Sequence, residues 1–234
     1  MTLTTIIPGV LCIGSALPDP PFEFVDGKTP AGFDVELMQA ICVKLSLTWQ
    51  LVPFNGQDFN GIFDGLGKTW DCVASGTTIT PQRQKVADFC DPYLESGQSL
   101  VCNTARTPHV HSIDDLAGMV IAVQHGNTSE PVAQRLKAEG RVADVRVYAY
   151  HDINQMLDDL AAGTIGAVMK LAPVMHWLTR NRPHLRVVQE RITDETLAVS
   201  VRRGDDVLRQ AINEAQAQLR SSGELEKLIN TWLR

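Results

Sequence analysis

The chain has 234 residues, of which 44% are hydrophobic and 21% charged. This length and composition predict a globular protein, with either one large domain or two small ones, and exclude a disordered chain. The net charge is −6, from 21 basic and 27 acidic residues, and no run of Lys or Arg occurs. We therefore expect neither nucleic acid nor an anionic membrane as a partner.

Targeting segments and metal motifs are not apparent in the sequence. No apolar run approaches the roughly 20 residues of a membrane span, and residues 1–8 lack the basic and apolar regions of a signal peptide. The five cysteines are an odd number and form no CxxC pair. We therefore expect no metal site, no thiol redox centre and no cofactor.

Strands and helices alternate through the first hundred residues. Apolar runs predict strands at 10–13, 50–54, 72–74 and 98–102, with a short helix at 59–66. A longer amphipathic helix is expected at 34–45, because its apolar residues recur on one face. These residues are Leu37, Met38, Ile41, Cys42 and Leu45.

The stretch SGTTITPQR, which ends at Arg83, places a cation at a predicted helix start. Thr80 is expected to be the N-cap and Pro81 the first helical residue. A cation in the first turn opposes the helix dipole, which favours a functional role, and an Arg can grip a carboxylate with two parallel hydrogen bonds. A surface ion pair of Arg83 with Asp88 or Asp91 is the alternative.

After a polar, proline-bearing segment at 104–112, the strand and helix rhythm resumes. Ser112 and the acids after it are typical of a capped helix start. Such alternation predicts α/β sheets with helices on both faces, and two α/β halves would bind a ligand in the cleft between them. Strands are expected at 120–123, 145–148, 167–169, 185–188 and 197–201, and helices at 128–139, 153–161, 173–181, 206–220 and 224–233.

Several short motifs occur in one order along nearly the whole chain. They are PPFEF at 20–24, GFDVEL at 32–37, DFNGI at 58–62, SGTTITPQR at 75–83, DFCDPY at 88–93, GNTSE at 126–130, TDE at 193–195 and TWL at 231–233. Together they resemble the polar amino-acid family of periplasmic solute-binding proteins, which feed ABC importers.

The resemblance implies a two-lobed α/β fold of the type II periplasmic-binding-protein kind. Each lobe would hold a mixed, mostly parallel sheet flanked by helices, with lobe two inserted into lobe one through two hinge crossings. Lobe one is expected at 1–103 and 195–234, and lobe two at 104–194. The implied protein is a monomer in the periplasm or on the extracellular face, which closes on a small ligand and delivers it to an ABC importer permease.

The resemblance also assigns a carboxylate-binding group to lobe one. In the family, the Arg of a Thr-Pro-x-Arg segment holds the α-carboxylate of the ligand with help from the preceding small and hydroxyl residues. The matching positions are Ser75, Gly76, Thr78 and Arg83.

Lobe two is expected to contribute a helix start. The matching residues are Asn127 and Thr128, and Thr128 is a good N-cap whose helix amides would point at an anion. Phe59 matches an aromatic residue that packs on the ligand side chain, with a place in the hydrophobic core as the alternative.

Two departures separate this chain from relatives that bind ordinary amino acids. The early acid and aromatic positions are Ala16 and Asp19, and the position of the ammonium-binding Asp is Leu171, preceded by Lys170. A buried charge without its partner costs about 3–5 kcal/mol, which corresponds to a hundred- to thousand-fold or more in affinity. We therefore expect a carboxylate ligand that is not a standard α-amino acid in the usual pose.

The two charged positions at these departures have alternative interpretations. Asp19 either receives a displaced amine or is a solvated loop acid. Lys170 either pairs with a second anionic group of the ligand or points outward.

Two other functions fit the same scaffold. One is an enzyme similar to the cyclohexadienyl dehydratases of this family, but elimination needs a placed general acid. Where those enzymes carry acids, this chain reads KLAPV from Lys170, so no catalytic residue is expected. The other is a ligand-sensing domain of a receptor.

Overall fold

The computed structural model describes residues 3–233, which form two compact units. Unit one contains the described residues up to Asn55, Asn60–Glu95 and the chain from Thr196 onward, and unit two contains Gly56–Phe59 and Ser96–Glu195. Met1, Thr2 and Arg234, at the ends of the predicted lobe one, lie outside the described residues. No helix within residues 3–233 is long and apolar enough to cross a membrane.

Unit one is built on a five-stranded sheet. Its strand order is β4 (Thr48–Pro53), β1 (Val10–Ser15), β5 (Cys72–Val73), β14 (Ser200–Arg202) and β6 (Ala87–Phe89). β1 pairs in parallel with β4 and β5, whereas β14 pairs antiparallel with β5 and β6. The carboxyl ends of β1 and β5 therefore meet at one edge, where the loops after both strands lie.

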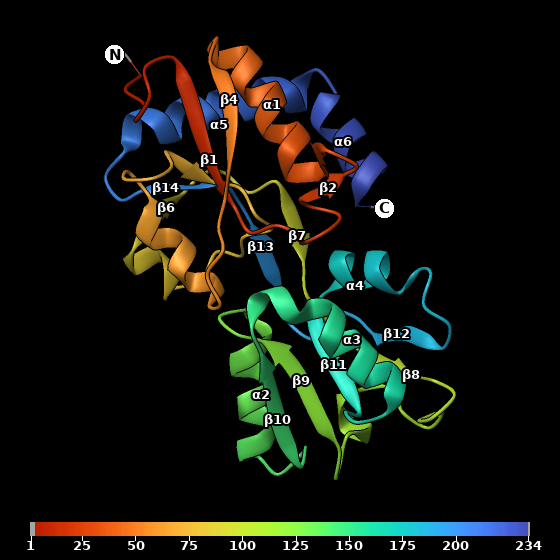
Figure 1. Cartoon of the computed structure of the whole chain (residues 1–234). Coiled ribbons are helices and arrows are strands. Elements are labelled where there is room, and N and C mark those ends of the chain that lie inside the picture. The colour runs from red at the N-terminus through yellow and green to blue at the C-terminus, as the bar shows by residue number, and fades with distance from the viewer. Residues whose placement is uncertain (1–2, 234) are drawn as a thin grey trace. The chain divides into compact units, whose positions relative to one another are not determined.

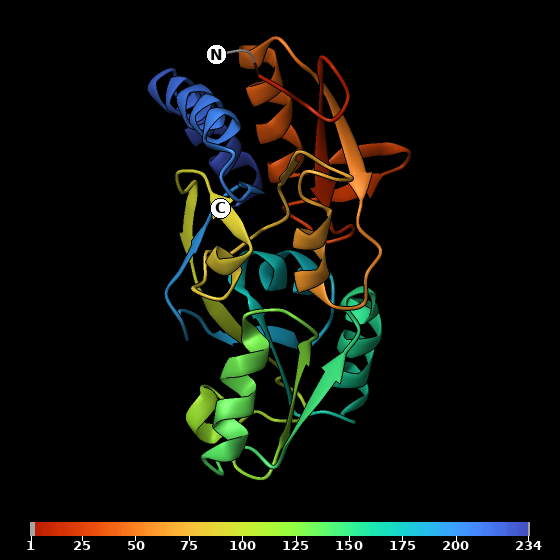
Figure 2. The ribbon, with the colours of Figure 1, turned by 90° about the vertical axis from the view of Figure 1, so that its left-hand side faces the viewer.

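Helices cover this sheet, and the predicted apolar face of the first helix is buried. α1 (Phe33–Leu45) buries Leu37, Met38, Ile41 and Cys42. α5 (Asp206–Ser221) and α6 (Glu224–Trp232) pack against α1, and Figure 2 shows the blue C-terminal helices beside the orange α1. The predicted helix at 59–66 is a 3₁₀ helix, η1 (Phe59–Gly65).

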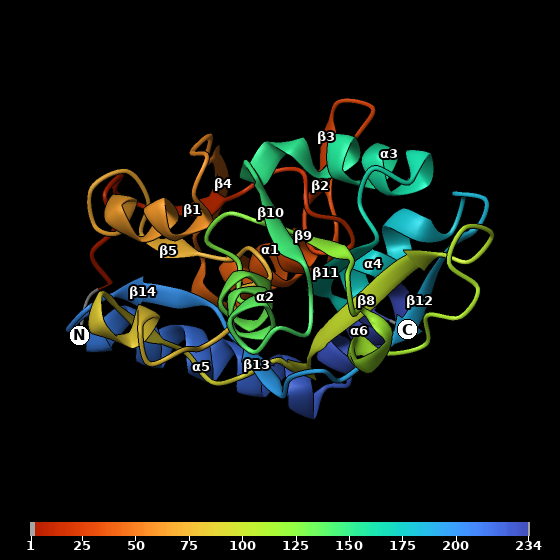
Figure 3. The same ribbon diagram turned by 90° about the horizontal axis from the view of Figure 1, so that it is seen from below.

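Unit two has a second five-stranded sheet with helices on both faces. The order is β10 (Asp144–Tyr148), β9 (Val120–Gln124), β11 (Ala167–Leu171), β8 (Gln98–Asn103) and β12 (Leu185–Gln189). β9 pairs in parallel with β10 and β11, and β8 pairs antiparallel with β11 and β12 (Figure 1). α2 (Ser129–Ala138) and α3 (Ile153–Ala162) lie on opposite faces (Figure 3), as right-handed crossovers from β9 to β10 and from β10 to β11 require.

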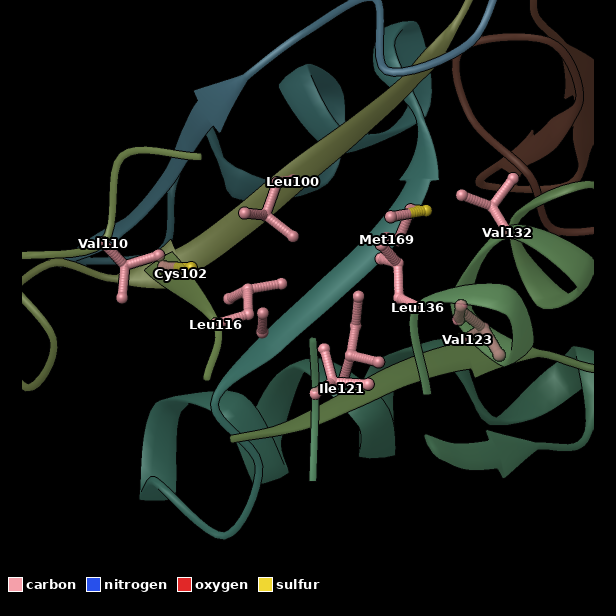
Figure 4. Close-up of a cluster of buried hydrophobic side chains, with 12 residues drawn as sticks. Leu100, Cys102, Val110, Leu116, Ile121, Val123, Val132, Leu136 and Met169 are labelled. Atoms are coloured by element: carbon pink, nitrogen blue, oxygen red, sulfur yellow. The ribbon is translucent and has the colours of Figure 1, made fainter. Parts of the chain in front are cut away.

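The core of unit two lies on the α2 face of its sheet. Figure 4 shows Leu100, Ile121 and Met169 from three strands facing Val132 and Leu136 of α2. Because side chains alternate along a strand, Leu171 shares the face of Met169, and Lys170 points to the face of α3.

Two strands mark where the chain passes between the units. β7 (Leu94–Ser96) leads out of unit one, β13 (Glu195–Leu197) leads back, and the two pair with each other. Gly97 follows β7 closely, where an added Cβ would lie 2.0 Å from the carbonyl oxygen of Thr193. Only glycine fits there without a backbone shift.

The structure differs from the sequence prediction at the boundaries and in the small sheets. Lobe one was expected to extend to residue 103, but β8 pairs with β11 and β12 and belongs to the sheet of unit two. The strand expected at 197–201 is interrupted, because the Ala198 amide bonds the Thr77 carbonyl and the Val199 carbonyl accepts from Cys90. The short hairpin of β2 (Phe24–Asp26) and β3 (Thr29–Ala31) was not predicted.

Candidate functional site

The loop that follows β5 in unit one ends in a tight turn at Arg83. Thr80 Oγ1 accepts the Arg83 amide at 3.1 Å, and the Thr80 carbonyl accepts the Gln84 amide. The hydrogen bond expected of a Thr80 cap is therefore present, but no α-helix begins at Pro81: the 3₁₀ turn η2 (Arg83–Lys85) follows, and its N-cap position is Gln82. The short turn fixes the backbone of Arg83 at the carboxyl edge of the sheet.

The Arg83 side chain is 5% exposed, so it is not a surface cation. Its Nη1 donates to the Thr78 carbonyl at 2.9 Å and its Nε to Asn60 Oδ1 at 3.2 Å, while the guanidinium lies 5.6 Å from the Phe63 ring centroid. Asp88, one of the expected surface partners, accepts the Gly204 amide instead. These contacts orient the guanidinium within unit one.

Ser75 and Gly76 are bonded to acidic side chains of unit one. Ser75 Oγ donates to Glu23 Oε1 and accepts the Ala16 amide at 3.0 Å. The Gly76 amide donates to Asp34 Oδ2 at 2.6 Å. Gly76 has φ +52°, and a Cβ there would lie 2.9 Å from the Phe22 ring, so this position requires glycine.

Asp34 is a buried acid at the start of α1. Its pKa is raised to about 7, mainly by burial and to a smaller extent by the charge of Asp19, while the hydrogen bonds from Gly76 and Tyr93 lower it. Asp19 itself is buried and is not the solvated loop acid that was the alternative interpretation. Unit one thus holds buried carboxyl groups close to the Gly76 loop.

In unit two, Thr128 precedes α2 but does not cap it with its side chain. Its hydroxyl donates to Glu195 Oε2 at 2.9 Å and accepts from Gln98 Nε2 at 2.9 Å. The Gly126 amide at this helix start donates to Glu130 Oε2 at 2.8 Å. The expected side-chain cap is therefore wrong, because the Thr128 hydroxyl is bonded to Glu195 and Gln98.

Asn127 lies in the turn between β9 and α2. Its side-chain amide donates to Gln124 Oε1 at 3.4 Å, and its backbone amide donates to the Gln124 carbonyl. Asn127 is half-buried and follows the carboxyl end of β9 after His125 and Gly126.

Lys170 and Leu171 end β11 at the same edge of the unit-two sheet. Lys170 is 2% exposed, and its Nζ lies 5.4 Å from the ring centroid of Tyr150. Lys170 therefore does not point outward into solvent, which was one of its two interpretations. Leu171 is buried and stands opposite Gln98 in the β8–β11 register.

Phe59 belongs to unit two, although the predicted boundaries placed it in lobe one. Its amide donates to the His125 carbonyl at 3.2 Å, and its ring lies 5.3 Å from that of Tyr150. Phe59 is buried. The aromatic pair therefore lies with Lys170 at the carboxyl edge of the sheet.

Each unit brings part of the predicted set together. Unit one gathers Ser75, Gly76, Thr78, Arg83 and Asp19, and unit two gathers Phe59, Asn127, Thr128, Lys170 and Leu171. Sequence reasoning missed the roles of Asp34, Gln98 and Glu195. Asp34 and Glu195 lie inside motifs that carried the resemblance, and Gln98 is the polar first residue of an apolar strand, so each offered a signal.

Comparison with known proteins places this geometry in a family. The model of bacterial extracellular solute-binding proteins, family 3, matches residues 11–234. The chain belongs to this family. It is 30% identical over 223 residues to the putative ABC transporter arginine-binding protein 2 of Escherichia coli strain K12, covering 92% of this chain and 87% of that protein.

Solved structures show the same fold. An ancestral arginine-binding protein bound to arginine superposes with a TM-score of 0.87 at 30% identity, covering 97% of this chain and 99% of that one. An ancestral amino acid-binding protein, described as a precursor of cyclohexadienyl dehydratase, gives a TM-score of 0.84 at 28% identity, with 97% and 96% covered. The type II periplasmic-binding-protein fold is thus confirmed.

The relatives also define the general activity. The named curated relatives are binding proteins of ABC transporters, not enzymes, and the dehydratase alternative finds no support among them. Members of this family are extracytoplasmic proteins that bind amino-acid ligands and work with ABC transporter permeases. This chain is therefore a solute-binding protein.

Proposed function

We propose that this protein captures a small carboxylate-bearing solute by closing around it and delivers it to an ABC importer permease as a monomer. The observation that carries this proposal is the buried Arg83 guanidinium, which bonds to Thr78 and Asn60 orient at the carboxyl edge of the unit-one sheet. An Arg fork of this kind suits bidentate binding of a carboxylate. Ser75 and Gly76 support the loop that carries it.

The ligand is amino-acid-like but is not held as a standard α-amino acid in the usual pose. Leu171 offers no charge for an α-ammonium, and it is buried. Asn127, Thr128 and Lys170 supply the polar groups of unit two, and the Phe59 ring supplies an apolar surface. Asp19 supplies a buried acid in unit one.

The test is a titration of small carboxylates, with and without an α-amino group, followed by thermal unfolding and calorimetry. Carboxylates without an α-amine should stabilise the protein, and standard α-amino acids should stabilise it little. Arg83→Gln should weaken binding by about 10- to 100-fold, because a charge-assisted bond contributes about 1.5–3 kcal/mol.

Arg106→Gln is the matched control, because it also removes one positive charge but lies at an exposed position of unit two. It should leave the affinities unchanged. Strong stabilisation by several ordinary amino acids, or equal binding by Arg83→Gln, would contradict the proposal.

A further inference from the structure

Four side chains of unit two, two buried and two half-buried, form a network that we call the Gln98 network. It consists of Gln98, Thr128, Thr193 and Glu195. Glu195 Oε1 accepts from Gln98 Nε2 and from Thr193 Oγ1, each at 2.8 Å. Glu195 Oε2 accepts from Thr128 Oγ1 at 2.9 Å. Neutral donors therefore fix the Glu195 carboxylate.

The network sets the direction of the Thr128 hydroxyl. A carboxylate only accepts hydrogen bonds, and a hydroxyl has one proton, so Thr128 gives that proton to Glu195. One lone pair of Thr128 Oγ1 accepts the hydrogen bond from Gln98 Nε2. The second lone pair remains as a hydrogen-bond acceptor. In this arrangement the hydroxyl has no proton to donate to a ligand carboxylate.

The same hydrogen bonds also orient the Gln98 side-chain amide. Its nitrogen faces the oxygens of Thr128 and Glu195, so its Oε1 turns away from both. Gln98 is 2% exposed, and Oε1 has no hydrogen-bond partner among residues 3–233. A buried amide oxygen without a donor is costly, which indicates that a donor is supplied from outside the chain.

The local charge agrees with these two acceptors. The Glu195 carboxylate lies in the network, and Glu130 binds the Gly126 amide two residues before Thr128. Leu171 lies opposite Gln98 in the strand register, so the neighbour of Gln98 on β11 is an apolar side chain. Two carboxylates near the start of α2 repel an anion and attract a cation.

We propose that the Gln98 network receives a cationic nitrogen group of the ligand, an ammonium or a guanidinium, at Gln98 Oε1 and Thr128 Oγ1. Glu195 acts as a positioning residue, which keeps the Thr128 hydroxyl turned as an acceptor and supplies the negative charge. This inference rests on the proposed function and deepens it, because it gives the ligand a cationic group, other than an α-ammonium in the usual pose, at the sheet edge where Leu171 lies.

The experiment uses guanidinium chloride and sodium acetate as probes, each titrated at constant ionic strength into the full-length ¹⁵N-labelled protein. NMR follows the Gln98 side-chain amide, identified by its loss in Gln98→Leu, and the Arg83 Nε–H. Guanidinium should shift the Gln98 signals and acetate should not. Glu195→Gln and Thr128→Val should each weaken guanidinium binding by about 10-fold or more.

Ser99→Ala is the matched control, because Ser99 neighbours Gln98 on β8 but bonds only the Lys170 carbonyl within the described chain. It should bind guanidinium like the wild type, and the unfolding temperature of each variant without probe reports its folding. Acetate shifts at Gln98, no guanidinium shift there, or an unchanged guanidinium affinity in folded Glu195→Gln would each overturn the inference. The Arg83 signal tests the proposed function separately, since acetate should shift it in every folded variant.

Discussion

Leu171 is the residue on which the proposed ligand class depends. It ends β11, shares the sheet face of the unit-two core and stands opposite Gln98. An aspartate in this place would put a carboxylate beside the Gln98 amide, whereas leucine puts a buried apolar surface there. Under the proposed function, this residue decides whether an α-ammonium can be neutralised at this strand end.

Leu171→Asp is expected to create binding of standard α-amino acids. The new carboxylate would supply the partner that an α-ammonium lacks, a gain of roughly a hundred-fold or more in affinity if the loss is about 3–5 kcal/mol. Isothermal titration with glycine and L-alanine measures the effect. Leu171→Asn is the control, since it matches the shape of Asp without the charge. An Asp variant that folds but gains no affinity would show that position 171 does not face the ammonium.

At the scale of elements, the start of α1 is tied to the loop after β5. Asp34, in the first turn of α1, accepts the Gly76 amide at 2.6 Å and the Tyr93 hydroxyl at 3.2 Å. A negative charge near a helix N-terminus is favourable, but complete burial opposes the charge more strongly and raises the pKa of Asp34 to about 7. The helix and the loop that leads to Arg83 are therefore joined by one titratable group.

The contribution of Asp34 to stability should fall as the pH rises. The folded-state pKa of about 7 exceeds the reference value of 3.8, so between these values the folded chain holds a proton that the unfolded chain has lost. The free energy of unfolding then decreases by at most about 1.4 kcal/mol per pH unit through that window. The loss levels off once the pH is well above the folded-state pKa, where Asp34 is ionised in both states.

Urea unfolding of the wild type and of Asp34→Asn between pH 4.5 and 8 measures this dependence. The Asn variant keeps an acceptor oxygen for Gly76 but cannot titrate, so its stability should vary less with pH. An identical pH profile for both proteins would contradict the assignment. Asp26→Asn is a matched control, because Asp26 is an exposed acid of the same unit.

At the scale of the whole molecule, each unit carries its own sheet, helices and buried thiols. All five cysteines are free and buried, four in unit one and Cys102 in unit two. Burial raises the pKa of the thiols of Cys42, Cys90 and Cys102 to about 12. Because the thiolate is the reactive form, these side chains report unfolding of the unit in which they lie.

Native protein at pH 8 should not react with a thiol reagent within minutes, and denaturant should expose all five cysteines. Pulsed alkylation with peptide mass spectrometry across a urea series reads each position separately. If the two units unfold independently, Cys102 is labelled at a different urea concentration from the unit-one thiols. Rapid labelling of any cysteine without urea would contradict the burial.

Sequence patterns predicted most elements, because helix and strand periodicities are local properties. The apolar stripe of α1, the capping box at Ser112 and the strands on both sides of α2 and α3 were all inferred from residue spacing. The unit boundaries at β8 and Phe59 were not predicted, because the sheet that a strand joins depends on pairing partners far away in the sequence. The turn at Arg83 was expected as an α-helix for a similar reason, because the length of a helix depends on the segments that pack around it.

The sequence by itself determined the family, the alternation of strands and helices, and the presence of Arg83 with leucine at position 171. Only the tertiary structure decided which donors remain for a ligand. Ser75, Gly76 and Thr128 each carry a donor in the sequence, yet Glu23, Asp34 and Glu195 bind those donors in the fold. A residue's type fixes which hydrogen bonds it can make, and its neighbours in space decide which of them are already made.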